Sequence, residues 1–132
     1  MKVKIEKQED GTYIAYNIGD EDFALIGTGD TVTMAKEDFF NSIKETKEVY
    51  KDCGEEMPVG LESEPTFIFD LSSLFEYYNV LNVSAFARLI GINEALMRQY
   101  KRGNTYISDV QLKKIEAGIH KIGKEFQSLQ LV

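Results

Sequence analysis

Residues 83–103 read VSAFARLIGINEALMRQYKRG, and apolar residues recur in this stretch at helical spacing. Gly91 lies near the middle and can adopt a positive φ without steric cost, so it marks the end of a first helix. Asn82 or Ser84 can cap that helix, and Asn93 can cap a second one. The stretch therefore predicts two short helices joined by a tight turn.

The two helices match the helix-turn-helix pattern, in which a small residue inside the first helix precedes a glycine at the turn. Ala87 is the small residue that lets the helices cross closely, and Gly91 is the glycine. Apolar residues on both sides are expected to form a shared core. The predicted core consists of Phe86, Ala87, Ile90, Gly91, Ile92, Met97 and Tyr100.

The outer face of the second helix predicts contacts with DNA. At about 100° per residue, Ala95, Arg98 and Arg102 lie on one side of this helix. Arginine can bind a guanine edge, glutamine an adenine edge and alanine a thymine methyl group. Glu94 counts against this reading because a carboxylate repels phosphate, although it can accept a hydrogen bond from cytosine. The predicted DNA-binding residues are Asn93, Glu94, Ala95, Arg98, Gln99, Lys101 and Arg102. The alternative is a packed helical unit with a solvated basic face.

Charge is divided unevenly along a chain of 132 residues whose formal net charge is −7. Residues 1–70 contain 7 Lys, no Arg and 17 Asp or Glu, which gives −10. Residues 71–132 contain 8 Lys or Arg and 5 Asp or Glu, which gives +3. This asymmetry predicts two modules, 1–70 and 71–132, with partners of opposite charge.

The first module has the pattern of a small sheet with one helix. Val3 and Ile5 lie on one face of a predicted strand, and Ile14, Tyr16 and Ile18 share one face of the next. Tight turns favour an antiparallel arrangement of sequential strands. The three predicted strands cover residues 2–7, 12–18 and 23–28.

A helix from about Thr33 to Cys53 follows, with Asp30, Thr31 or Thr33 as its cap. After a loop rich in proline and glutamate, TFIFD at 66–70 predicts a fourth, well-buried strand. The expected fold is therefore an α+β module of order β-β-β-α-β, followed by an all-α helix-turn-helix (lambda-repressor-like) module.

Catalytic and metal-binding chemistry is not expected. Asp20, Glu21, Asp22 and Asp30 can be read as a cation site, but acidic residues in turns usually bond to their own backbone. One cysteine and one histidine can form neither a disulfide nor a metal site. No apolar run is long enough to span a bilayer and no signal peptide precedes the first strand, so we expect no membrane association and a cytoplasmic location.

The chain as a whole resembles the HicB family of antitoxins from bacterial type II toxin–antitoxin systems. Its first part resembles the partial RNase H fold of that family, in the segments KVKIEK, TYIAYNI, FALIGT, MAKEDFFNSIKETKEVY and TFIFD. Its second part resembles the helix-turn-helix version of the DNA-binding domain of the family, in AFARLIGINEALMRQYKRGNTYIS and QLKKIEAGIHKIGKEF.

The resemblance implies a role for each module. Residues 1–70 would bind and inhibit a HicA-like toxin, a small basic ribonuclease that cleaves mRNA, with the acidic segments 20–22 and 55–64 as candidate contacts. Residues 71–132 would bind double-stranded operator DNA and repress the operon. The family is not expected to be catalytic, and no cofactor is expected. The alternative is a stand-alone repressor whose first module senses a ligand or a protein.

A helix-turn-helix reads a short half-site, so a homodimer or a higher oligomer is expected on a palindromic operator. The apolar C-terminal helix and the terminal segment SLQLV either supply the contact between copies or pack within the monomer.

Overall fold

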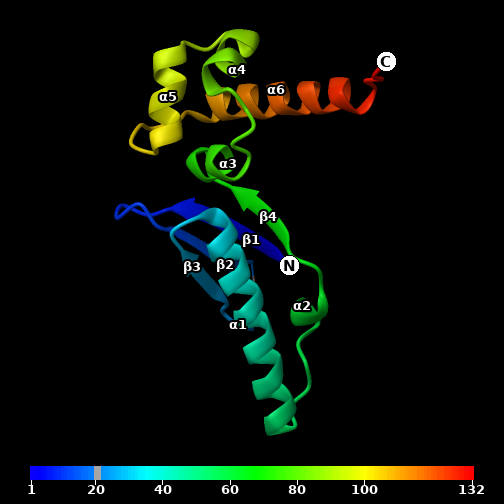
Figure 1. The fold of residues 1–132 in the computed structure, drawn as a ribbon. Coiled ribbons are helices and arrows are strands. Elements are labelled where there is room, and N and C mark those ends of the chain that lie inside the picture. The colour runs from blue at the N-terminus through cyan, green and yellow to red at the C-terminus, as the bar shows by residue number, and fades with distance from the viewer. Residues whose placement is uncertain (20–21) are drawn as a thin grey trace. The chain divides into compact units, whose positions relative to one another are not determined.

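In the computed structural model, which describes residues 1–19 and 22–132, four strands form a mixed sheet of order β3-β2-β1-β4 (Figure 1). The first three strands are antiparallel neighbours, as the sequence predicted. The fourth strand pairs parallel to the first, with Val3 opposite Phe67. The strands are β1 (Lys2–Lys7), β2 (Tyr13–Ile18), β3 (Ile26–Gly29) and β4 (Thr66–Phe69).

The prediction that the fourth strand is well buried is wrong. β4 is an edge strand with a single neighbour, β1, and Ile68 is 42% exposed. Phe67 and Phe69 are half-buried, in register with the two buried residues of β1. An apolar run reports hydrophobicity but not the number of neighbouring strands, so the sequence overestimated the burial.

One long helix, α1 (Val32–Cys53), supplies the helical layer of this sheet. It begins at Thr31, whose hydroxyl accepts a hydrogen bond from the Met34 N–H at 3.2 Å, and ends at Gly54 with φ 67°. A Cβ on Gly27 of β3 would overlap the backbone of Phe39, so helix and strand lie in close contact there. The core between helix and sheet contains Val3, Ile5, Tyr13, Ala15, Leu25, Val32, Ala35, Phe39, Ile43 and Leu61.

The buried side of β2 differs from the apolar face that its sequence suggests. Tyr13 and Ala15 are buried, whereas Ile14, Tyr16 and Ile18 are only partly buried on the other side of the strand. Antiparallel pairing places Ala15 opposite Ile5, and paired residues share a face of the sheet. The register with β1 therefore decides which side of β2 enters the core.

Two short helices complete this part of the chain. α2 (Val59–Glu62) lies in the segment expected to be a loop, and its Leu61 is 1% exposed within the core. α3 (Leu71–Tyr77) begins at Asp70, whose carboxylate accepts a hydrogen bond from the Ser73 N–H at 2.7 Å. α3 packs against β1, β4 and α1.

The packing of α3 moves the boundary between the two modules. Residues 1–79 form one compact unit and residues 80–132 another. The sequence placed the boundary after Asp70, where the strand pattern stops. A change of secondary structure does not by itself end a packed unit, and here the helix that follows the last strand belongs to the first unit.

The second unit is entirely helical among its described residues and contains α4 (Val83–Ile90), α5 (Glu94–Arg102) and α6 (Asp109–Gln127). Ser108 begins α6 by accepting a hydrogen bond from the Gln111 N–H at 3.3 Å. A Cβ on Gly118 of α6 would overlap the Ile90 side chain, so α4 and α6 pack closely. The chain is thus an α+β protein with a four-stranded mixed sheet and a helical C-terminal part.

Over the described residues, none of the helices combines the length and the apolar character that a membrane span requires.

Candidate functional site

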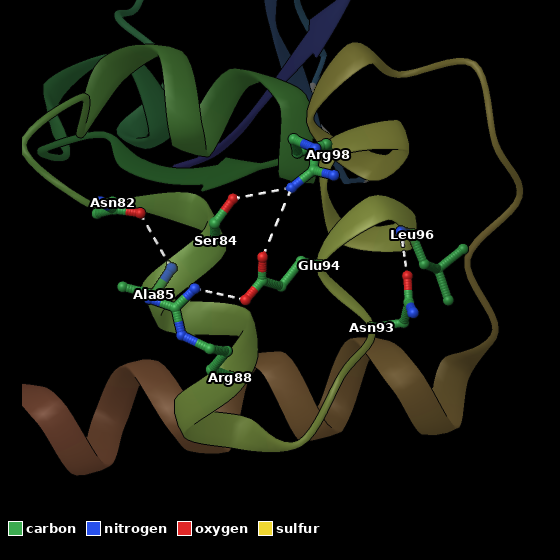
Figure 2. Close-up of polar contacts among 8 residues, drawn as sticks. All are labelled: Asn82, Ser84, Ala85, Arg88, Asn93, Glu94, Leu96 and Arg98. Carbon is green, nitrogen blue, oxygen red and sulfur yellow. Dashed lines mark hydrogen bonds and ion pairs between the residues drawn. The ribbon is translucent and has the colours of Figure 1, made fainter.

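Side-chain and backbone hydrogen bonds fix the two short helices of the second unit. The Asn82 side chain accepts a hydrogen bond from the Ala85 N–H at 3.0 Å, and the Asn93 side chain accepts one from the Leu96 N–H at 3.1 Å (Figure 2). Asn82, and not Ser84, therefore caps the first helix. These caps set where α4 and α5 begin.

Gly91 makes the turn between α4 and α5. Its φ is 72°, in the left-handed region that favours glycine. The next residue, Ile92, donates its N–H to the Ala87 carbonyl at 2.9 Å. The turn therefore has the conformation that the sequence predicted for it.

Most of the predicted shared core is buried. Ala87 and Met97 have no exposed surface, and Ile90 is half-buried against Gly118 of α6. Gly91 is exposed, as a turn residue, and contributes conformation rather than buried surface. The remaining predicted core residues are buried: Phe86, Ile92 and Tyr100.

The predicted DNA-binding residues lie on the accessible side of α5. Six of the seven are exposed: Asn93, Ala95, Arg98, Gln99, Lys101 and Arg102. The seventh, Glu94, is half-buried at the start of the helix. The side chains that hold α5 in the unit, Met97 and Tyr100, face the other way. The six exposed residues include three cations, Arg98, Lys101 and Arg102, and two side-chain amides, Asn93 and Gln99.

Glu94 is held between two arginines (Figure 2). Its carboxylate forms an ion pair with Arg88 of α4, and its second oxygen lies 3.8 Å from a guanidinium nitrogen of Arg98. Arg98 also donates a hydrogen bond to the Ser84 hydroxyl at 3.1 Å. These contacts link α4 to α5 at the exposed surface and place two cations beside the one carboxylate that weighed against DNA binding.

Arg88 and Ser84 were not predicted as members of this group. Both lie on α4, and only the turn at Gly91 brings them beside α5. A helical wheel drawn for one helix carries no information about the neighbouring helix. A second helical wheel, drawn for α4 and placed beside that of α5 with the turn at Gly91 between them, would have identified both residues.

The division of charge is sharper when counted by compact unit. Residues 80–132 contain 8 Lys or Arg and 4 Asp or Glu, a net charge of +4. Residues 1–79 contain 7 Lys and 18 Asp or Glu, a net charge of −11. The basic side chains of α5 therefore lie in a unit that is itself cationic.

A smaller polar cluster lies on the sheet of the first unit, on the side opposite the core. Glu6 forms an ion pair with Lys4 and accepts a hydrogen bond from the Tyr16 hydroxyl at 2.8 Å. Burial raises the pKa of the Glu6 carboxyl, but the bonds from Lys4 and Tyr16 outweigh it, so the net pKa is lowered. The cluster is a satisfied ion pair with no unpaired group.

Only some of the acidic residues considered as a cation site in the sequence lie within the residues that the structure describes. Asp20 and Glu21 lie outside the described residues, while Asp22 and Asp30 are exposed. Within residues 1–19 and 22–132, no group of three or more His, Cys, Asp or Glu side chains is arranged to hold a metal ion. His120 and Cys53 are both exposed.

Comparisons with protein-family models, with curated proteins and with solved structures find no match to this chain.

Proposed function

We propose that the chain is an antitoxin that binds operator DNA through α4 and α5, arranged as a helix-turn-helix, and neutralises a HicA-like ribonuclease through its first unit. The observation that carries the DNA-binding half is the exposed side of α5. It presents Arg98, Gln99 and Arg102, while the opposite side is buried. A helix that is anchored on one side and presents cations and an amide on the other has the groups that read base edges in a major groove.

The ion pairs at the start of α5 support the same proposal. A lone carboxylate at Glu94 would repel phosphate, but Arg88 and Arg98 compensate its charge. The contact from Arg98 to Ser84 restricts the guanidinium before DNA arrives. Restricting a side chain in advance lowers the entropy that binding costs.

Charge supports the second half of the proposal. The first unit carries −11, and an acidic surface attracts a basic partner at long range. The partner we propose is the small basic toxin implied by the family resemblance. In this proposal the first unit is a partial RNase H-like domain without nuclease activity, the protein is cytoplasmic, and it acts without a cofactor as a homodimer or higher oligomer.

The DNA-binding half is tested by replacing Arg102 with alanine. We expect Arg102→Ala to weaken binding to the DNA upstream of the gene by about 1–3 kcal/mol, because a good base contact contributes that much. Fluorescence anisotropy against salt concentration measures the loss. If Arg102 contacts phosphate instead, the salt slope falls by about 0.9.

Lys121→Ala is the matched control, since it removes an exposed cation of α6 rather than of α5. Equal weakening by both variants would mean that net charge, and not the face of α5, binds the DNA. If neither Arg102→Ala nor Arg98→Ala weakens DNA binding, α5 is not the helix that reads the DNA.

The antitoxin half is tested by coexpression with the product of the neighbouring gene. We expect a short basic protein that copurifies with the chain and is toxic without it. A neighbouring gene that encodes no such protein would favour the stand-alone repressor, whose first unit senses a ligand or another protein.

A further inference from the structure

The guanidinium of Arg98 is held from two sides at the surface of the second unit (Figure 2). One carboxylate oxygen of Glu94 pairs with Arg88 of α4, and the other lies 3.8 Å from a guanidinium nitrogen of Arg98. The same nitrogen donates a hydrogen bond to the Ser84 hydroxyl at 3.1 Å. Arg98 is therefore restrained by a carboxylate of its own helix and by a hydroxyl of α4.

The position of Glu94 argues against a direct contact between its carboxylate and a base. A carboxylate that accepts a hydrogen bond from cytosine must turn an oxygen toward that base. Both oxygens of Glu94 already face arginines, Arg88 on one side and Arg98 on the other. A turn toward a base would break one of these ion pairs, so the carboxylate acts on the arginines.

The carboxylate changes which contacts Arg98 makes most readily. A positive charge alone can bind phosphate, as lysine does, whereas a guanidinium binds a guanine edge bidentately only in one orientation. Glu94 lowers the net charge that this surface offers to phosphate, and together with Ser84 it restricts the orientation of the guanidinium. Both effects favour the base contact over the phosphate contact.

We propose that Glu94 is a positioning residue that sets the sequence specificity of DNA binding by acting through Arg98, a role that rests on the proposed function of α5. It also disfavours wrong sequences, because a misplaced phosphate near Glu94 meets a negative charge. Exposed ion pairs contribute little to the stability of a fold. The pair between Glu94 and Arg98 therefore matters for recognition rather than for folding.

Binding of the full chain to two duplexes tests this role. One duplex is the DNA upstream of the gene, and the other is a scrambled duplex of the same length and composition. Specificity is the dissociation constant for the scrambled duplex divided by that for the upstream duplex. We expect Glu94→Gln to lower this ratio at least about fivefold, which is the smallest discrimination typical of a good bidentate contact. Its affinity for the scrambled duplex should rise, because a charge that repels phosphate is lost.

Glu116→Gln is the matched control, because it removes the same charge from an exposed position on α6. We expect this variant to keep the specificity ratio of the wild type, since a change in net charge affects both duplexes alike. If Glu94→Gln lowers the ratio no more than Glu116→Gln does, Glu94 does not set specificity.

An Arg98→Ala background separates positioning from a direct contact. If Glu94 acts through Arg98, then Glu94→Gln should have no further effect on the ratio once Arg98 is absent. A full further loss in that background would mean that Glu94 contacts DNA itself or supports the fold, and would overturn the proposal.

Nitrogen-15 relaxation of the Arg98 side chain checks the restraint in the free chain, without DNA. We expect the Nε–H group of Arg98 to be more mobile on the ps–ns timescale in Glu94→Gln than in the wild type. Equal mobility in both would show that Glu94 does not restrain Arg98 and would overturn the proposal.

Failure of this proposal and failure of the proposed function give different results. A wild type that prefers the upstream duplex, together with an unchanged ratio in Glu94→Gln, would overturn the role of Glu94 alone. A wild type that binds both duplexes equally would overturn DNA reading by α5 and the role of Glu94 with it.

Discussion

The two compact units differ in how far apart in the sequence their decisive contacts lie. In residues 1–79, β1 pairs with β4, and the Asp70 N–H donates to the Ile5 carbonyl at 2.9 Å. In residues 80–132, the caps of α4 and α5 join residues three positions apart. Contacts between distant residues depend on the whole fold, whereas a cap is set by its own few residues. The helix ends of the second unit were therefore easier to predict from the sequence than the strand partners of the first.

The units also differ in charge, −11 against +4, and this difference is visible in the sequence. The corrected boundary increases it, because α3 brings Glu76 into the acidic unit, where its carboxylate accepts a hydrogen bond from the Val32 N–H at 2.9 Å. Three predictions test the contrast between distant and local contacts.

The largest expected effect comes from the core of the first unit. Phe39 has no exposed surface and makes an edge contact with Phe67, so we expect Phe39→Ala to lower the free energy of unfolding by about 3–5 kcal/mol. Hydrogen exchange resolved by residue measures the loss in residues 1–79 separately from residues 80–132. Protection in α4 and α5 should be unchanged.

Phe40→Ala is the control for this core substitution. Phe40 also makes an edge contact with Phe67, but it is 47% exposed, so the loss should stay near 1 kcal/mol. A loss of protection throughout residues 80–132 in the Phe39→Ala variant would contradict the division into two units.

A local substitution should have an intermediate effect in the second unit. Gly91→Ala forces a side chain into the left-handed region and should cost roughly 1–2 kcal/mol. Gly91→Asn should cost less, because asparagine tolerates this conformation. Thermal unfolding and the exchange of α4 and α5 amides measure both. If Gly91→Ala and Gly91→Asn lower the free energy of unfolding equally, then backbone strain does not dominate at the turn.

The smallest expected effect is the pH dependence contributed by Glu6. Its pKa is lowered in the folded state, so its stabilising effect is complete above the unfolded pKa and is lost as pH falls through the folded pKa. The group is partly exposed, and we expect less than about 1 kcal/mol. Urea unfolding of the wild type and Glu6→Gln across the acid range measures it. A wild type with the same acid dependence as Glu6→Gln would rule out this contribution.

Local signals in the sequence determined the elements themselves. Alternation predicted the strand that contains Val3 and Ile5, and Asn93 and Gly91 marked where α5 begins and α4 ends. The exposed side of α5 followed from helical periodicity, because one anchored side leaves the other accessible. The charge of each part followed from counting.

Only the tertiary structure decided which elements meet. It made β4 a parallel edge strand, selected Ala15 over Ile14 for the core, and assigned α3 to the first unit. It also brought Arg88 and Arg98 to Glu94 across the turn. Strand partners, register and contacts between helices depend on residues far apart in the chain, so periodicity within one segment cannot specify them.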